Sequence, residues 1–283
     1  MDHQHSVSAP QMRQCSVDIR VRCNINFTGR DNGPVVMLAH GFGCDQNMWR
    51  QVTAKLGEQS RLLLFDHVGA GRSALTAWDA GRYATLDGYA RDVLDICRDL
   101  DLHDVIFVGH SVSAMIGVLA VAEQPDRFAG LVLLTPSPCY IDQGDYRGGF
   151  THDDIEELLE SLDSNYLGWS ASMAPMIMGN PDRPELGQEL TASFCRTDPT
   201  IAKAFARVTF LSDQRADLPR VRVPTLVVQS ANDAIAPPEV GAYVNAHIPD
   251  SRLVTLNATG HCPQLSAPQA TAQAIASFVA EHR

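Results

Sequence analysis

A serine, an aspartate and a histidine in this sequence have the types and order that nucleophilic catalysis needs. The serine, Ser111, follows an apolar run that ends at Gly109, and a small-residue segment continues from Val112 toward Gln124. A strand, a tight turn and a helix with serine at the apex form a nucleophile elbow, which exposes the hydroxyl beside the free N–H groups of the helix. The G-x-S-x-G pattern is matched in four of five places, with Ser113 at the fifth. The ordinary alternative is a structural turn that contains serine.

The aspartate and the histidine, Asp233 and His261, lie further along the chain, each just beyond an apolar run typical of a buried strand. A serine hydroxyl is a poor nucleophile until a base takes its proton, and histidine does this near neutral pH. An aspartate can hold the imidazole in the required tautomer. Taken singly, Asp233 could be a helix cap or a turn residue and His261 a structural side chain. Together with Ser111, in this order, they predict a catalytic triad.

Acyl transfer also needs N–H donors for the oxyanion. The backbone N–H of Val112, directly after the serine, is one candidate. The expected second donor is the N–H of Phe42 in the segment His40-Gly41-Phe42-Gly43, where glycines allow a sharp turn.

Other residues near these segments are competing candidates. His40 and His110 are rivals for the base, but both stand beside backbone turns and are expected to pack there. Cys44 and Cys262 flank the predicted site and are interpreted as small buried thiols, because neither stands at an elbow.

A second glycine pattern follows another predicted strand. Residues 69–74, Gly-Ala-Gly-Arg-Ser-Ala, match the dinucleotide fingerprint G-x-G-x-x-A. That fingerprint must open a helix, and residues 75–87 have no helical stripe, so a structural loop is predicted instead. The sequence contains no H-E-x-x-H, Walker-type loop or evident metal cluster, and we expect neither a metal nor another cofactor.

The elements that must position these residues alternate between strand and helix patterns. This order predicts an α/β fold with a mostly parallel sheet covered by helices on both faces. In such sheets functional groups gather at the carboxyl ends of the strands. The predicted buried strands are residues 34–39, 61–66, 105–109, 130–135, 224–229 and 252–256, and the predicted helices are residues 45–56, 86–100, 112–124, 238–248 and 268–280.

The alternation stops after residue 136, and only helical patterns follow as far as residue 217. Thr151 with Asp154 three residues later predicts a capping box, and Asp198 before Pro199 predicts another helix start. We therefore expect a helical cap inserted into the α/β core.

The whole chain then divides into three parts. Residues 1–14 are polar and aperiodic and are expected to form a loose tail. The core comprises residues 15–137 and 218–283, and the cap comprises residues 138–217. Apolar residues at alternating positions over residues 17–27 predict one or two edge strands.

The composition of the chain argues against several classes of function. The chain has 283 residues and a formal net charge of -11, which argues against nonspecific binding to nucleic acid or anionic membranes. Seven cysteines without a C-x-x-C pair indicate reduced thiols and a cytoplasmic location. No apolar run approaches membrane-spanning length, and the first residues lack a signal core.

Several segments resemble the RsbQ-type α/β-hydrolases, bacterial relatives of the plant karrikin and strigolactone receptors. The elbow is generic to hydrolases, whereas the cap segments are specific. The resemblance extends from about Asn24 to the C-terminus. It rests on residues 40–46, 109–117, 137–140 and 260–263 around the site, and on residues 148–150, 165–169, 181–185 and 194–199 in the cap.

The resemblance implies an α/β-hydrolase fold under a V-shaped cap of four helices, with the triad named above. It implies an apolar pocket below the cap, lined by Phe42, Trp169, Met173 and Phe210. Met173 stands where the plant hormone receptors carry a polar aromatic residue, which argues against strigolactone-like specificity. Dehalogenases and epoxide hydrolases are disfavoured, because they place aspartate where this chain has Ser111.

Two functions fit these expectations. One is a slow serine hydrolase of a small apolar ester or lactone that serves as a ligand sensor in a bacterial stress-signalling pathway, with a PAS-domain protein such as a phosphatase as partner. The alternative is an ordinary metabolic carboxylesterase. The triad would look the same in both.

Overall fold

The computed structural model describes residues 17–283, so the predicted tail at residues 1–14 lies outside the described residues. Its centre is a seven-stranded sheet of order β1-β3-β2-β4-β5-β6-β7. Among the strands of residues 17–283, only β1 at the edge is antiparallel to its neighbour, and the α/β fold class is confirmed. The strands are β1 (Asn26–Gly29), β2 (Val35–Ala39), β3 (Arg61–Leu64), β4 (Val105–His110), β5 (Phe128–Leu134), β6 (Thr225–Asn232) and β7 (Ser251–Thr259).

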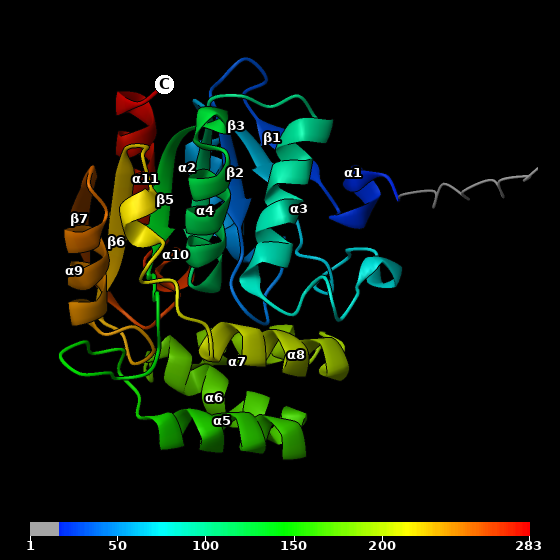
Figure 1. The fold of residues 1–283 in the computed structure, drawn as a ribbon, viewed down its shortest axis with the longest axis vertical. Helices are drawn as coiled ribbons and strands as arrows, with labels where there is room; N and C mark the ends of the chain where they lie inside the picture. Colours follow the sequence, from blue (N-terminus) through cyan, green and yellow to red (C-terminus); the bar gives the residue numbers. More distant parts are fainter. Residues whose placement is uncertain (1–16) are drawn as a thin grey trace, which may run out of the picture.

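Helices cover both faces of the sheet (Figure 1). Successive residues of a strand point to opposite faces, so Leu38 packs in one apolar core with α2 and α11, while Met37 packs in a second with α3 and α4. The helices on the two faces are α2 (Arg50–Leu56), α3 (Leu86–Asp99), α4 (Val112–Glu123), α9 (Pro238–His247), α10 (Pro263–Ser266) and α11 (Pro268–Glu281), with short 3-10 turns at Gln46–Trp49, Leu75–Ala77, Pro125–Arg127 and Leu218–Arg220.

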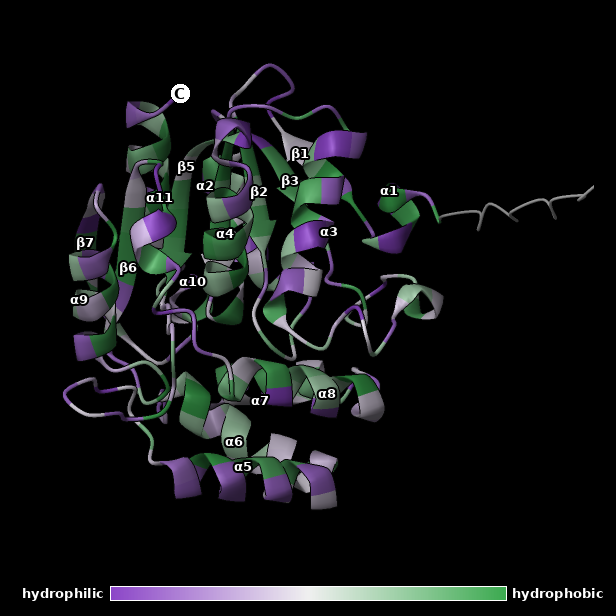
Figure 2. Ribbon diagram, in the orientation of Figure 1, coloured by the Kyte–Doolittle hydropathy of each residue, from purple (hydrophilic) through white to green (hydrophobic). Residues whose placement is uncertain are grey.

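Four further helices follow β5 and precede β6, and we call them the cap. They are α5 (His152–Ser164), α6 (Tyr166–Met178), α7 (Pro184–Phe194) and α8 (Pro199–Phe210), gathered at one end of the sheet (Figure 1). The predicted capping box of Thr151 and Asp154 starts α5, and Asp198 caps α8. Figure 2 shows hydrophilic colours along α5 and hydrophobic colours on the central strands. The apolar side chains of α5, Ile155, Leu158, Leu159 and Leu162, are buried.

The N-terminal edge differs from the prediction. Residues 17–27 do not form continuous strand: a short helix, α1 (Ile19–Arg22), comes first and β1 starts only at Asn26. The Asp18 side chain accepts a hydrogen bond from the N–H of Arg20, which caps the helix, and the apolar pair Ile19 and Cys23 is buried one turn apart. The two residues are four positions apart. This spacing places them on the same face of a strand, as predicted, but it also places them on the same face of a helix.

The glycine pattern at residues 69–74 forms a loop, as predicted. The N–H of Gly69 donates to the Ser73 hydroxyl, which itself donates to the carbonyl of Ala70, so the loop is closed on itself. A 3-10 turn of three residues follows instead of the long helix that a dinucleotide site needs. Among residues 17–283 no helix has the length and apolar character that crossing a membrane requires.

Candidate active site

Ser111 occupies the sharp turn between β4 and α4. Its backbone has φ 57° and ψ −121°, a strained conformation for a residue with a side chain. Close packing at the turn explains the small neighbours, since a Cβ on Gly109 would collide with the carbonyl oxygen of Ser113. The strain holds the hydroxyl at the start of α4, as the elbow motif predicts.

The structure joins the three predicted triad residues through hydrogen bonds. Nε2 of His261 lies 2.8 Å from Oγ of Ser111, and Nδ1 of His261 lies 2.8 Å from Oδ2 of Asp233. All three side chains are buried. With Nδ1 protonated and bonded to the carboxylate, Nε2 presents a lone pair to the serine hydroxyl, so the histidine is ready to act as a general base.

The other carboxylate oxygen of Asp233, Oδ1, holds the side chain in place. Oδ1 accepts hydrogen bonds from the backbone N–H groups of Ile235 and Ala236, at 2.9 and 3.1 Å. The carboxylate therefore caps the loop after β6 and orients His261 at the same time. Asp233 is therefore a turn residue, one of the alternatives that the sequence left open, and the same side chain bonds His261 through its other oxygen.

The segment His40–Gly43 lies against the elbow. A methyl group on Gly41 would lie 2.5 Å from Nδ1 of His110 and 3.5 Å from Cβ of Ser111. Within residues 17–283 the backbone N–H of Phe42 donates no hydrogen bond, and Val112 is the first residue of α4, where N–H groups have no helical partner. Both predicted oxyanion donors are thus free at the edge of the site.

The rival histidines are engaged elsewhere. Nε2 of His110 lies 2.8 Å from the backbone carbonyl of His261 and donates to it, and burial lowers the pKa of His110 to about 3. Burial also lowers the pKa of His40, whose Nδ1 bonds the carbonyl of Gly41. Both rings are neutral packing groups, and neither bonds Ser111.

The two cysteines also match their structural interpretation. Burial raises the pKa of Cys44 to about 12 and that of Cys262 well above its usual range. The thiolate is the nucleophilic form of cysteine, so neither residue has the character of a reactive thiol.

An apolar cavity opens on Ser111 and His261 between the core and the cap. Its volume is about 30 Å³, room for little more than a water molecule. The predicted pocket residues Phe42, Trp169, Met173 and Phe210 all line it, together with Cys44, His110 and Cys262 beside the triad. The structure adds lining residues that were not predicted from the sequence, namely Tyr140, Ile177, Leu190, Phe194, Thr209 and Ile235.

These added residues share no motif. Ile177, Leu190 and Phe194 have the helical spacing of ordinary core side chains, and only the folding of α6 and α7 over the elbow separates pocket from core. Phe42 belongs both to the pocket and to the segment His40–Gly43, and its ring centroid lies 6.1 Å from that of Trp169 and 5.8 Å from that of Phe194. From the sequence, the added residues could be assigned to the pocket only through the resemblance of the cap segments to those of related hydrolases.

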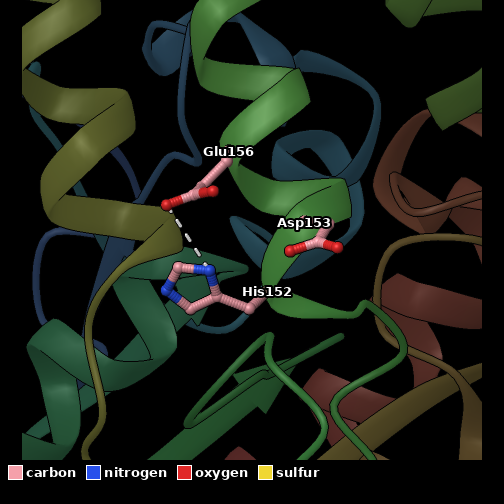
Figure 3. Close-up of side chains that lie close together, drawn as sticks. All are labelled: His152, Asp153 and Glu156. Atoms are coloured by element: carbon pink, nitrogen blue, oxygen red, sulfur yellow. Dashed lines mark ion pairs between the residues drawn. The ribbon is translucent and has the colours of Figure 1, made fainter.

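One further cluster has the residue types of a metal site. His152, Asp153 and Glu156 lie together in the first two turns of α5, with His152 Nδ1 3.5 Å from a Glu156 carboxylate oxygen (Figure 3). All three are exposed. Acidic side chains at a helix start are favoured by the helix dipole, and this explains the cluster without an ion.

Comparison with known proteins agrees with this geometry. The model of the alpha/beta hydrolase family matches residues 35–274. A probable esterase from Oryza sativa subsp. japonica is 42% identical over 246 residues, which are 87% of this chain and 91% of that protein. A strigolactone esterase from Arabidopsis thaliana is 39% identical over 84% of this chain and 90% of its own.

A solved structure gives the same result. A hydrolase from Oleispira antarctica superposes with a TM-score of 0.90 at 44% identity, covering 93% of this chain and 96% of that one. The family model spans both the elbow and the triad loops, and the relatives are covered almost completely. The chain therefore belongs to the alpha/beta hydrolase family.

Proposed function

We propose that the protein is a serine hydrolase of small apolar esters or lactones, with Ser111 as nucleophile, and that it works as a slow ligand sensor. The chain is an ester-hydrolysing enzyme of its family; the substrate and the sensor role are the proposal. The observation that carries the hydrolase part of the proposal is the hydrogen-bonded chain Ser111–His261–Asp233 facing an apolar cavity.

The proposed reaction passes through an acyl-enzyme. Oγ of Ser111 bonds to the ester carbonyl carbon while His261 takes the hydroxyl proton, and the N–H groups of Phe42 and Val112 hold the oxyanion. His261 then returns the proton to the leaving alcohol. Water repeats these steps on the acyl-enzyme, releasing the acid and restoring Ser111.

Trp169 tests the pocket assignment. Its indole is 4% exposed and stacks on Phe194, so it either lines the substrate site or only packs the cap. We expect Trp169→Ala to lower kcat/KM for p-nitrophenyl esters at least tenfold, since losing one methylene contact alone costs about tenfold or more, while Trp169→Phe keeps most activity. Kinetics on an ester series and thermal melting measure this. A melting temperature that collapses while kcat/KM of the folded fraction is unchanged supports packing alone.

The sensor proposal rests on the cap. A cavity of about 30 Å³ admits no ester, since ligand pockets span roughly 300–1,000 Å³, so substrate entry requires the cap or its side chains to move. The cap also reaches the catalytic loop, because the N–H of His261 donates to the carbonyl of Ile177 in α6 at 2.9 Å. Occupancy of the pocket would therefore change the outer surface of the cap, which a partner can read.

We expect a turnover number below roughly ten per second on the best ester, the median of enzymes, and altered hydrogen exchange in α5–α8 once a phosphonate occupies Ser111. Exchange followed by mass spectrometry, with the Ser111→Ala protein as control, measures the second effect. Turnover above that value with unchanged cap exchange favours the alternative, an ordinary metabolic carboxylesterase.

The resemblance to RsbQ-type hydrolases suggests the partner and the setting. A PAS-domain signalling protein such as a phosphatase, in a bacterial stress response, is the partner we propose. The six cysteines of residues 17–283 are all free, as is usual in a cytoplasmic protein, and we place the protein there. Binding of the PAS domain to wild-type protein with and without the phosphonate tests the partner directly.

A further inference from the structure

We infer that two serines outside the triad, Ser113 in α4 and Ser193 in α7, are positioning residues that hold the two ends of the oxyanion segment His40–Gly43. The inference rests on the proposed function, since it assigns the N–H of Phe42 to the oxyanion. It gives a role to the serine at the fifth place of the elbow motif, where glycine is usual, and it gives the cap a part in catalysis.

Ser113 holds the first end of the segment. Its Oγ donates to the carbonyl of His40 at 2.5 Å and lies 2.7 Å from Nε2 of His67. Because the hydroxyl proton goes to the carbonyl, Nε2 of His67 must carry the proton of the second bond. Ser113 is completely buried, so both partners would lose their hydrogen bonds if its hydroxyl were removed.

The same network extends along the segment. The backbone N–H of His67 donates to Nε2 of His40 at 3.0 Å, so the proton of the His40 ring is on Nδ1, which donates to the carbonyl of Gly41 at 2.9 Å. Burial lowers the pKa of both rings, which keeps them neutral and keeps these donor and acceptor roles fixed. Two successive carbonyls of the segment are thus anchored to buried side chains.

Ser193 holds the other end from the cap. Its Oγ donates to the carbonyl of Gly43 at 2.8 Å. Gly43 has φ +68°, and a Cβ there would collide with the ring of Phe194, so α7 packs tightly on this end of the segment. The carbonyls on both sides of Phe42 are therefore fixed, which leaves its N–H aimed at a constant position.

The predicted effect is on the transition state. An oxyanion donor works only if it is already in place, and small displacements of a reacting group are costly. We expect Ser113→Ala and Ser193→Ala each to lower kcat on p-nitrophenyl acetate about tenfold, with KM changed less than twofold. Ser193→Thr, which keeps the hydroxyl, should restore most of the activity lost in Ser193→Ala.

A trifluoromethyl ketone separates positioning from general damage. Its carbonyl carbon bonds to Oγ of Ser111, the proton passes to His261, and the ketone oxygen becomes an oxyanion. We expect its inhibition constant to rise by the same factor as kcat/KM falls in both alanine variants. Matched controls are Thr191→Ala in α7 and Thr271→Ala in α11, whose hydroxyls donate to their own helices.

The outcomes are distinct. Loss of kcat with proportional loss of ketone binding in the serine variants, and neither in the controls, supports the inference. Unchanged kcat in Ser193→Ala, or a loss of kcat without weaker ketone binding in the folded variants, overturns it. Wild-type protein that hydrolyses no ester and binds no ketone would instead contradict the proposed function. Ser193 is only half-buried, so this variant keeps the test open should Ser113→Ala fail to fold.

Discussion

Replacing Ser111 by alanine will abolish covalent labelling by a fluorophosphonate and lower kcat for ester hydrolysis by about 10⁶-fold, the loss known from removing a serine protease nucleophile. The substitution deletes only the hydroxyl. The strained backbone of the elbow, at φ 57°, is the same for alanine, and the melting temperature should change little. Gel labelling, steady-state kinetics and thermal melting measure the three quantities.

Cys44 provides the control for this experiment. It lines the same cavity and is the competing nucleophile, although burial raises its pKa to about 12. Cys44→Ser should retain full labelling. Labelling that persists in Ser111→Ala, or that is lost in Cys44→Ser, would show that the nucleophile is not Ser111.

The second large effect is expected at Asp233. In Asp233→Asn, Oδ1 can still accept from Ile235 and Ala236, but the new amide group donates to Nδ1 of His261. The ring proton is then forced to Nε2, which can no longer accept the proton of Ser111. We expect kcat to fall about 10⁴-fold, as for the equivalent change in a serine protease, with KM and folding little affected.

A matched substitution isolates the tautomer effect. Asp198 caps α8 by accepting from two successive N–H groups, those of Thr200 and Ile201, just as Asp233 accepts from two. Asp198→Asn changes the same atoms without touching a histidine, so its kcat should match wild type. A loss below tenfold in Asp233→Asn would mean that another acid orients His261.

The fold was largely predictable because the central strands of a sheet covered on both faces are apolar along nearly their whole length. Residues 34–39 and 105–109 have this pattern, and β2 and β4 lie there. The failure at residues 17–27 has a physical cause. Ile19 and Cys23 suit either period, and the helix there depends on distant partners: Arg22 bonds Asp92 and Asp95 of α3.

The candidate triad could be read from sequence because each member follows a buried strand, and strand ends meet at one edge of the sheet. The pocket could not be read in the same way. Leu190 and Phe194 differ from core residues only in lining the same cavity as Ser111, and their position there depends on how the four cap helices pack. The hydrogen bond from Ser193 to the carbonyl of Gly43 could not be predicted from the sequence either, since the two residues are 150 positions apart along the chain.

The insertion of the cap between β5 and β6 also affects the protein while it is being made. β5 and β6 are neighbours in the sheet, yet the cap separates Leu134 from Thr225 along the chain. At about 5–20 residues per second, the ribosome adds that stretch in several seconds to nearly twenty. During this time β5, apolar along most of its length, has an unpaired edge, and such edges bind other chains. We therefore expect nascent chains that stall within the cap to be prone to aggregation.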